Sequence, residues 1–160
     1  MPNLINVTGA VGGKPEELGS STMWKVKAGT TESIKPGYLV IEDNGNAGYV
    51  KAAANGYDSS VSKVIGIASS TSTETASADG FLPSVTTAAK LIVTLYATTP
   101  ASLTQAMRLA GVKYALDVSS GNYTLDQGTT SNGIFKLLNF DSSSTSPTYG
   151  LCTCVLNTEL

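Results

Sequence analysis

Hydrophobic residues in this 160-residue chain occur in short runs separated by Gly, Pro, Asn and Asp. Such runs, rich in Val, Ile, Leu and Tyr and bounded by turn-forming residues, are typical of β-strands. The pattern predicts strands at 23–28, 38–42, 48–53, 61–68, 81–85, 91–96, 112–118, 123–126, 134–140 and 149–156. Many short strands and one short helix predict a mainly β, small single-domain fold of the β-barrel or sandwich-like kind.

The most specific local signals lie in the central stretch 27–68. Lys35-Pro36-Gly37-Tyr38 has Pro and Gly where a type II turn needs them. Asp43-Asn44-Gly45-Asn46 contains the Asn-Gly step that tight hairpins favour. Gly66 interrupts an apolar strand, which indicates a bulge or the close approach of another backbone. The nearly continuous apolar run at 91–96 indicates a strand in the middle of a sheet.

One segment, 99–111, has helix signals at both ends. Thr99 stands as N-cap, Pro100 at the first helical position and Gly111 just past the end. We expect its apolar face to lie across the sheet and to consist of Leu103, Ala106, Met107 and Ala110. The polar segment 69–80 has little to bury, so we expect an exposed connecting loop.

The first 22 residues are Gly-rich, with a brief apolar alternation. We interpret 1–22 as an extended N-terminal arm outside a β domain at 23–160, and a disordered terminus as the alternative. An arm of this kind can add a strand to the sheet edge of a partner. The residues expected to make that contact are Asn3, Leu4, Ile5, Asn6, Val7 and Thr8. Deleting residues 1–20 would then leave the domain folded.

Composition limits the possible functions. The chain is 41% hydrophobic but only 14% charged, below the usual value of about 25%. Its net charge is −2 and it has no run of Lys or Arg, so we expect no nucleic acid and no membrane as a partner. We also expect no signal peptide and no membrane span, since the N-terminal residues lack a basic leader and no stretch is apolar over about 18 residues, and we expect a protein made and kept soluble.

Few residues are suited to catalysis or metal binding. The chain contains no histidine, which is the commonest general base and a common zinc ligand. The oxygen-rich segment 42–46 could hold calcium, but it lacks the spacing of an EF-hand loop and a plain hairpin turn is the better interpretation. Cys152 and Cys154 would share one strand face, a poor disulfide geometry, and we interpret them as small buried hydrophobes. We therefore expect no enzyme, no metal and no cofactor.

A resemblance to a known family lies in two groups of motifs. The first group comprises Ala28-Gly29, the run Ser33-Ile34-Lys35-Pro36-Gly37-Tyr38-Leu39-Val40 and Val64-Ile65-Gly66-Ile67-Ala68. The second comprises residues 96–104, 111–116, 121–126 and 135–141. Together they resemble the capsid decoration proteins, also called head-stabilising or cement proteins, of tailed bacteriophages. The likeness extends over residues 24–157, and its motifs are loose structural signatures.

The resemblance implies a structural virion protein made in the host cytoplasm. Such a protein binds the outer surface of the expanded capsid and stabilises it by bridging neighbouring major capsid protein subunits. The implied partners are the phage major capsid protein and copies of the chain itself, with a trimer favoured. A cyclic oligomer that engages several shell subunits at once gains effective concentration for each later contact.

Two alternatives remain open on the sequence. One is another virion β domain, such as a head fibre base or a tail component. The other is a carbohydrate-binding or adhesin-like β domain, which would need an exposed aromatic platform, whereas the aromatic residues here are spread singly along the predicted strands.

Overall fold

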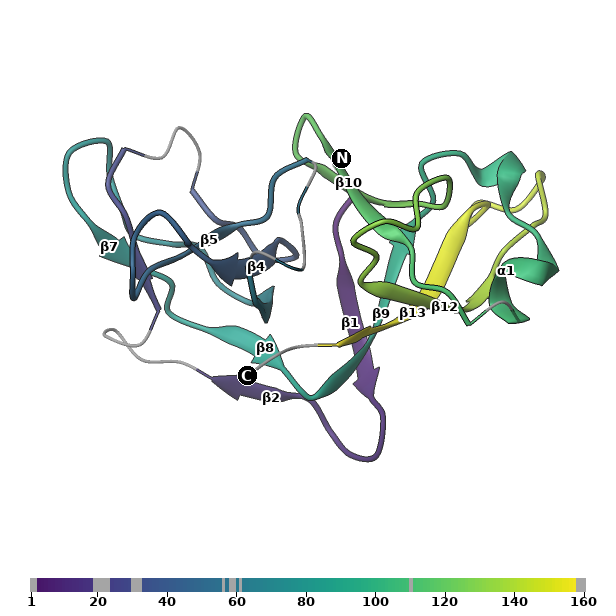
Figure 1. Ribbon diagram of the computed structural model, residues 1–160, viewed down its shortest axis with the longest axis horizontal. Helices are drawn as coiled ribbons and strands as arrows, with labels where there is room; N and C mark the ends of the chain where they lie inside the picture. Colours follow the sequence, from purple (N-terminus) through teal and green to yellow (C-terminus); the bar gives the residue numbers. More distant parts are fainter. Residues whose placement is uncertain are drawn as a thin grey trace.

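The computed structural model describes residues 3–18, 24–29, 33–55, 57, 60, 62–109 and 111–157. Their strands form four separate antiparallel sheets, which lie in two adjacent halves of one molecule (Figure 1). The fold is therefore mainly β and sandwich-like, as predicted. The described strands do not close into a barrel.

The first half contains the described strands between residues 16 and 87. Its larger sheet has the order β2-β8-β6-β4-β5, and β3 pairs with β7 beside it. The bounds are β2 Glu16–Leu18, β3 Lys25–Val26, β4 Leu39–Glu42, β5 Val50–Ala52, β6 Val64–Ala68, β7 Gly80–Phe81 and β8 Val85–Thr87.

The second half contains the N-terminal strand and the last part of the chain. Its larger sheet has the order β1-β9-β13-β12, and β10 and β11 form a hairpin beside it. The bounds are β1 Asn6–Ala10, β9 Lys90–Tyr96, β10 Ala115–Ser119, β11 Asn122–Asp126, β12 Phe135–Phe140 and β13 Leu151–Asn157. As predicted, β9 is an inner strand, with Leu91, Val93 and Leu95 fully buried.

The predicted turn at 35–38 is confirmed, whereas Asn44-Gly45 does not form a tight two-residue hairpin, because the β4–β5 pair closes only between Asp43 and Tyr49. Gly37 has a φ of 89°, and the amide of Tyr38 donates to the carbonyl of Lys35 at 3.1 Å, as a type II turn requires. The expected close approach at Gly66 is also present, because a Cβ atom there would lie 2.4 Å from the carbonyl oxygen of Thr86. Only glycine therefore fits where β6 passes β8.

The N-terminal segment is extended, but it is not an arm outside the domain. β1 pairs with β9, and β2 pairs with β8. The side chain of Ile5 is only 1% exposed. The prediction of a separate arm at 1–22 is therefore wrong for the described residues 3–18, and deletion of residues 1–20 would remove two strands and a core side chain.

The predicted helix is shorter than expected and interrupted. A single 3-10 turn spans Pro100–Ser102, and helix α1 spans only Gln105–Leu109. Leu103 between them has extended backbone (φ −70°, ψ 132°), and the Thr99 side chain makes no capping hydrogen bond. Of the predicted apolar face, Leu103 is buried and Met107 is partly buried against the core, Ala106 is exposed, and Ala110 lies outside the described residues.

Segment 69–80 is only partly the exposed loop that composition predicts. Ser72 and Glu74 are buried, and the Ser72 hydroxyl accepts a hydrogen bond from the amide of Ile34 at 2.8 Å. The segment is thus attached to the first half by side-chain contacts, although its polar composition predicts that it is exposed to solvent.

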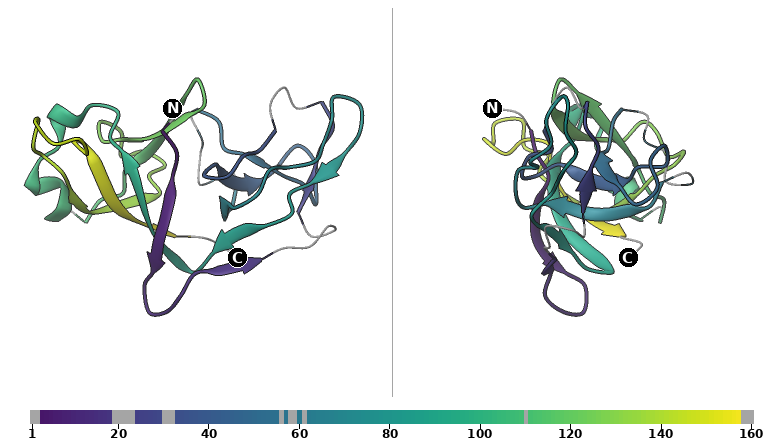
Figure 2. Two further views of the ribbon diagram at one scale, coloured as in Figure 1. Left: turned by 180° about the vertical axis from the view of Figure 1, so that it is seen from behind. Right: turned by 90° about the vertical axis from the view of Figure 1, so that its left-hand side faces the viewer.

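One hydrophobic core includes residues from both halves. Tyr123 on β11 is 2% exposed and joins the halves directly. Its ring packs against the ring of Tyr38 with centroids 4.8 Å apart, and its hydroxyl donates to the carbonyl of Ala53 at 3.1 Å. Because the core is shared, the two halves visible in Figure 2 form a single domain.

Candidate functional site

A groove of about 330 Å³ lies beside β1, where the second half meets the first. Residues 4–7 line one side of it, and Pro36, Ile67 and Thr86 line the other. We call it the β1 groove. It brings four of the six predicted contact residues into one surface feature.

The main chain of β1 presents an edge to this groove. The amide of Ile5 donates to the carbonyl of Gly37 at 3.1 Å, so the main-chain groups of Ile5 point away from β9. Main-chain groups two residues apart in a strand point to the same edge, and the register irregularity of β1 begins only after Val7. Val7 therefore directs its N–H and C=O to the same side as Ile5. Among the residues described, no strand pairs with Val7 there.

The six predicted contact residues have different environments. Ile5 is part of the core and is not available to a partner. The amide of Asn3 donates to the Asn122 side chain at 2.7 Å, and its carbonyl accepts from the Tyr123 amide at 2.8 Å. Leu4 and Val7 are half-buried at the groove, whereas Asn6 and Thr8 are exposed. The groove, rather than a free arm, is thus the accessible feature of this segment.

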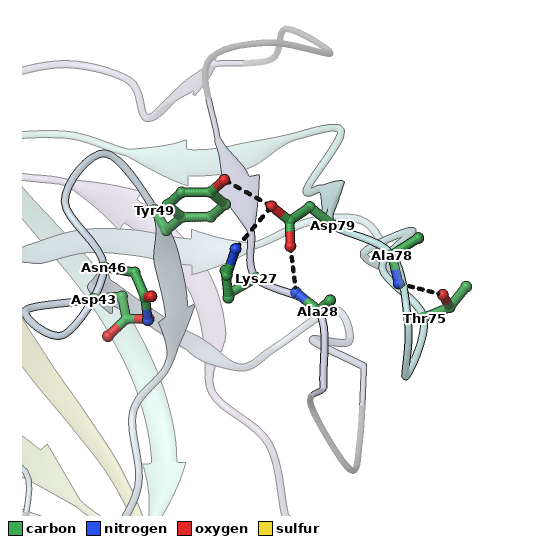
Figure 3. Close-up of polar contacts among 8 residues, drawn as sticks. All are labelled: Lys27, Ala28, Asp43, Asn46, Tyr49, Thr75, Ala78 and Asp79. Atoms are coloured by element: carbon green, nitrogen blue, oxygen red, sulfur yellow. Dashed lines mark hydrogen bonds and ion pairs between the residues drawn. The ribbon is translucent and has the colours of Figure 1, made fainter.

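A second cluster of polar side chains centres on Asp79, at the end of segment 69–80 (Figure 3). One carboxylate oxygen accepts from the Tyr49 hydroxyl at 2.7 Å and from the Lys27 ammonium at 3.2 Å. The other accepts from the amide of Ala28 at 2.8 Å. We call this arrangement the Asp79 clamp, because it joins the residues that follow β3, the loop before β5 and the end of segment 69–80.

The donors of the clamp stabilise the ionised carboxylate. The hydrogen bond from the Ala28 amide, followed by that from Tyr49 and by the Lys27 contacts, lowers the pKa of Asp79 from 3.8 to about 2. The same bond to Asp79 raises the pKa of Tyr49, because ionising the phenol would remove the donor. Asp79 is thus a fixed negative charge at neutral pH.

A pocket of about 430 Å³ lies next to this clamp. Trp24, Val50 and Ile65 form its apolar part, and Glu42, Asp43 and Tyr49 line its polar side. We call it the Trp24 pocket. Trp24 is 6% exposed and its ring nitrogen donates to the carbonyl of Leu18 at 3.3 Å, which confirms the prediction that it is a core anchor.

The oxygen-rich segment 42–46 is a hairpin turn. The Asp43 carboxylate accepts from the Gly45 amide at 3.1 Å and from the Asn46 side chain at 2.7 Å, and it pairs with Lys51 at 3.2 Å. These contacts use both oxygens within the chain. In the part of the chain that the structure describes, no group of three or more potential metal ligands lies together.

The two cysteines are buried on one face of β13, as predicted, and are not joined by a disulfide. Burial raises the pKa of the Cys152 thiol to about 12, and burial also raises the pKa of Cys154. Neither thiol is therefore a reactive nucleophile at neutral pH. Within the described ranges, no helix is long and apolar enough to cross a membrane.

Sequence reasoning did not find the Asp79 clamp or the Trp24 pocket. Lys27, Tyr49 and Asp79 come from three different segments and follow no motif spacing. The apolar alternation at Leu4, Ile5 and Val7 was a signal for a strand, but it could not name β9 as the partner.

No family model, curated protein or solved structure matches this chain. A function for this chain is therefore inferred from the sites described above and from the motif resemblance.

Proposed function

We propose that this protein is a capsid decoration protein, a structural component of a tailed-phage virion that binds the outer surface of the expanded shell. It acts without catalysis, by bridging neighbouring major capsid protein subunits, and it works as a homo-oligomer with a trimer favoured. The motif resemblance supports the family. The observation that supports this mode of binding is the main-chain edge of Val7 in the β1 groove, with which no described strand pairs.

The proposed contact is strand addition. An extended segment of the capsid protein enters the β1 groove and hydrogen-bonds to the N–H and C=O of Val7, with Leu4 and Pro36 providing apolar contact. The roles of the two proteins are thus the reverse of those predicted from the sequence, because β1 accepts a strand from the partner and does not add one to the partner's sheet. Main-chain hydrogen bonds provide affinity, and the groove walls provide selectivity.

The test is co-sedimentation with undecorated expanded capsids of the parent phage. The wild-type protein should bind saturably at micromolar concentration and raise the temperature at which the capsids are disrupted. Val7→Pro removes the outward N–H while the pairing of Asn6 with Thr94 remains, since proline is tolerated on a strand edge that faces solvent. We expect this variant to bind at least about tenfold more weakly, which corresponds to about 1.4 kcal/mol.

Val7→Ala is the matched control, because it shortens the same side chain but keeps the amide. It should bind nearly as well as the wild type, and circular dichroism should show that both variants are folded. Hydrogen exchange provides a second measurement, in which the Val7 amide should gain protection on capsids. Equal binding of Val7→Pro would refute strand addition, and absence of wild-type co-sedimentation would refute the decoration function.

A further inference from the structure

The Trp24 pocket combines an apolar interior with a carboxylate, Glu42, that forms no ion pair with a described residue. Val50 lies directly opposite Glu42 in the β4–β5 pair, and both line the pocket with Ile65. Val50 and Ile65 are buried. The volume of about 430 Å³ falls in the range of about 300–1,000 Å³ found for ligand sites.

Two of the nearby negative charges are already matched. Asp43 pairs with Lys51 at 3.2 Å, and Asp79 pairs with Lys27 at 3.2 Å. Glu42 is different. Among the residues that the structure describes, no lysine or arginine pairs with its carboxylate and no donor is bonded to it. The Glu42 carboxylate therefore adds to the pocket lining a negative charge that no ion pair with a described residue balances.

The aromatic side chains add to this preference. The ammonium of Lys27 lies 5.2 Å from the centroid of the Tyr49 ring, so the ring already attracts one cation of the chain, and Asp79 balances that cation. Aromatic rings stabilise a second cation in the same way, and most strongly where water is excluded. Trp24 offers the larger ring at the same pocket.

We propose that the Trp24 pocket binds a lysine side chain of a partner polypeptide. The aliphatic stem packs against Trp24, Val50 and Ile65, and the ammonium group pairs with the Glu42 carboxylate. This contact does not depend on the decoration function, because it concerns the chemistry of one side chain and not the identity of its owner.

The test uses Nα-acetyl-lysine amide as the probe and the intact protein. Trp24 is the only tryptophan, so its fluorescence and its indole N–H resonance report on the pocket directly. We expect saturable binding in the millimolar range that weakens with added salt, because the pair is partly solvent-exposed. The probe acetylated at Nε, which has the same stem but no charge, should bind at least about tenfold more weakly.

Glu42→Gln should weaken binding of the lysine probe by about tenfold or more and should leave the fold intact. Glu16→Gln is the matched control, since it makes the same charge change at an exposed residue of β2 outside the pocket, and it should bind like the wild type. Equal binding of the neutral probe, or an unchanged response in Glu42→Gln, would overturn the proposal. Absence of saturable binding would also overturn it, and binding of methyl glucoside alone would show a carbohydrate site in its place. Because no capsid is used, the result is independent of the test of the decoration function.

Discussion

Replacing Ile5 by Ala tests whether the N-terminal segment belongs to the core. The Ile5 side chain is 1% exposed, within the core shared by both halves. Truncating a buried isoleucine to alanine costs about 2–5 kcal/mol, because it loses apolar burial and leaves a cavity. Since a domain of this kind has a total stability of about 5–15 kcal/mol, the loss would be a large fraction of the whole.

The assay is urea unfolding followed by the fluorescence of Trp24, with Asn6→Ala as the matched control. Asn6 is the next residue of the same segment and is exposed, so its truncation should change the unfolding free energy by less than about 0.5 kcal/mol. The urea dependence of the free energy should be similar in both variants. If Ile5→Ala were as stable as Asn6→Ala, residues 3–10 would be an arm outside the core, and the reasoning from burial would fail.

Two further predictions concern ionisable groups. The pKa of Asp79 is about 2, below its ordinary value of 3.8. The clamp should therefore contribute its full share of the unfolding free energy above pH 3.8 and lose it as the pH falls toward 2. The difference in unfolding free energy between wild type and Asp79→Asn should accordingly shrink over this range, and a constant difference would contradict the clamp. Because the pKa values of Cys152 and Cys154 are raised by burial, both thiols should resist iodoacetamide at pH 8 in the native protein and react in urea. Mass spectrometry measures the modification, and rapid labelling of the native protein would contradict the buried position.

The parts of the fold that sequence predicts well are those set by neighbouring residues. The turn at 35–38 follows from Pro36 and Gly37, because their backbone preferences act within four residues. The inner position of β9 follows from its apolar composition. The helix prediction at 99–111 was wrong at its start, where Thr99 makes no capping hydrogen bond, and in its middle, because the end signals do not specify the extended backbone of Leu103.

The candidate sites were less predictable because they depend on distant pairs. The β1 groove exists only because β1 pairs with β9, and the hydroxyl of Thr8 donates to the carbonyl of Ile92, 84 positions later. The clamp likewise joins Lys27 to Asp79 across 52 positions. The local backbone preferences of these residues do not specify their distant partners, whereas packing of the complete chain does.

The order β1-β9-β13-β12 has a consequence for biosynthesis. β1 leaves the ribosome well before its sheet partner β9, and the inner position of β9 is completed only when β13 has been made. Contacts between residues this far apart form slowly, since the intervening chain must first be brought together. The nascent chain therefore exposes Ile5 and the apolar face of β9 during translation, and premature termination before residue 151 would release a fragment prone to aggregation.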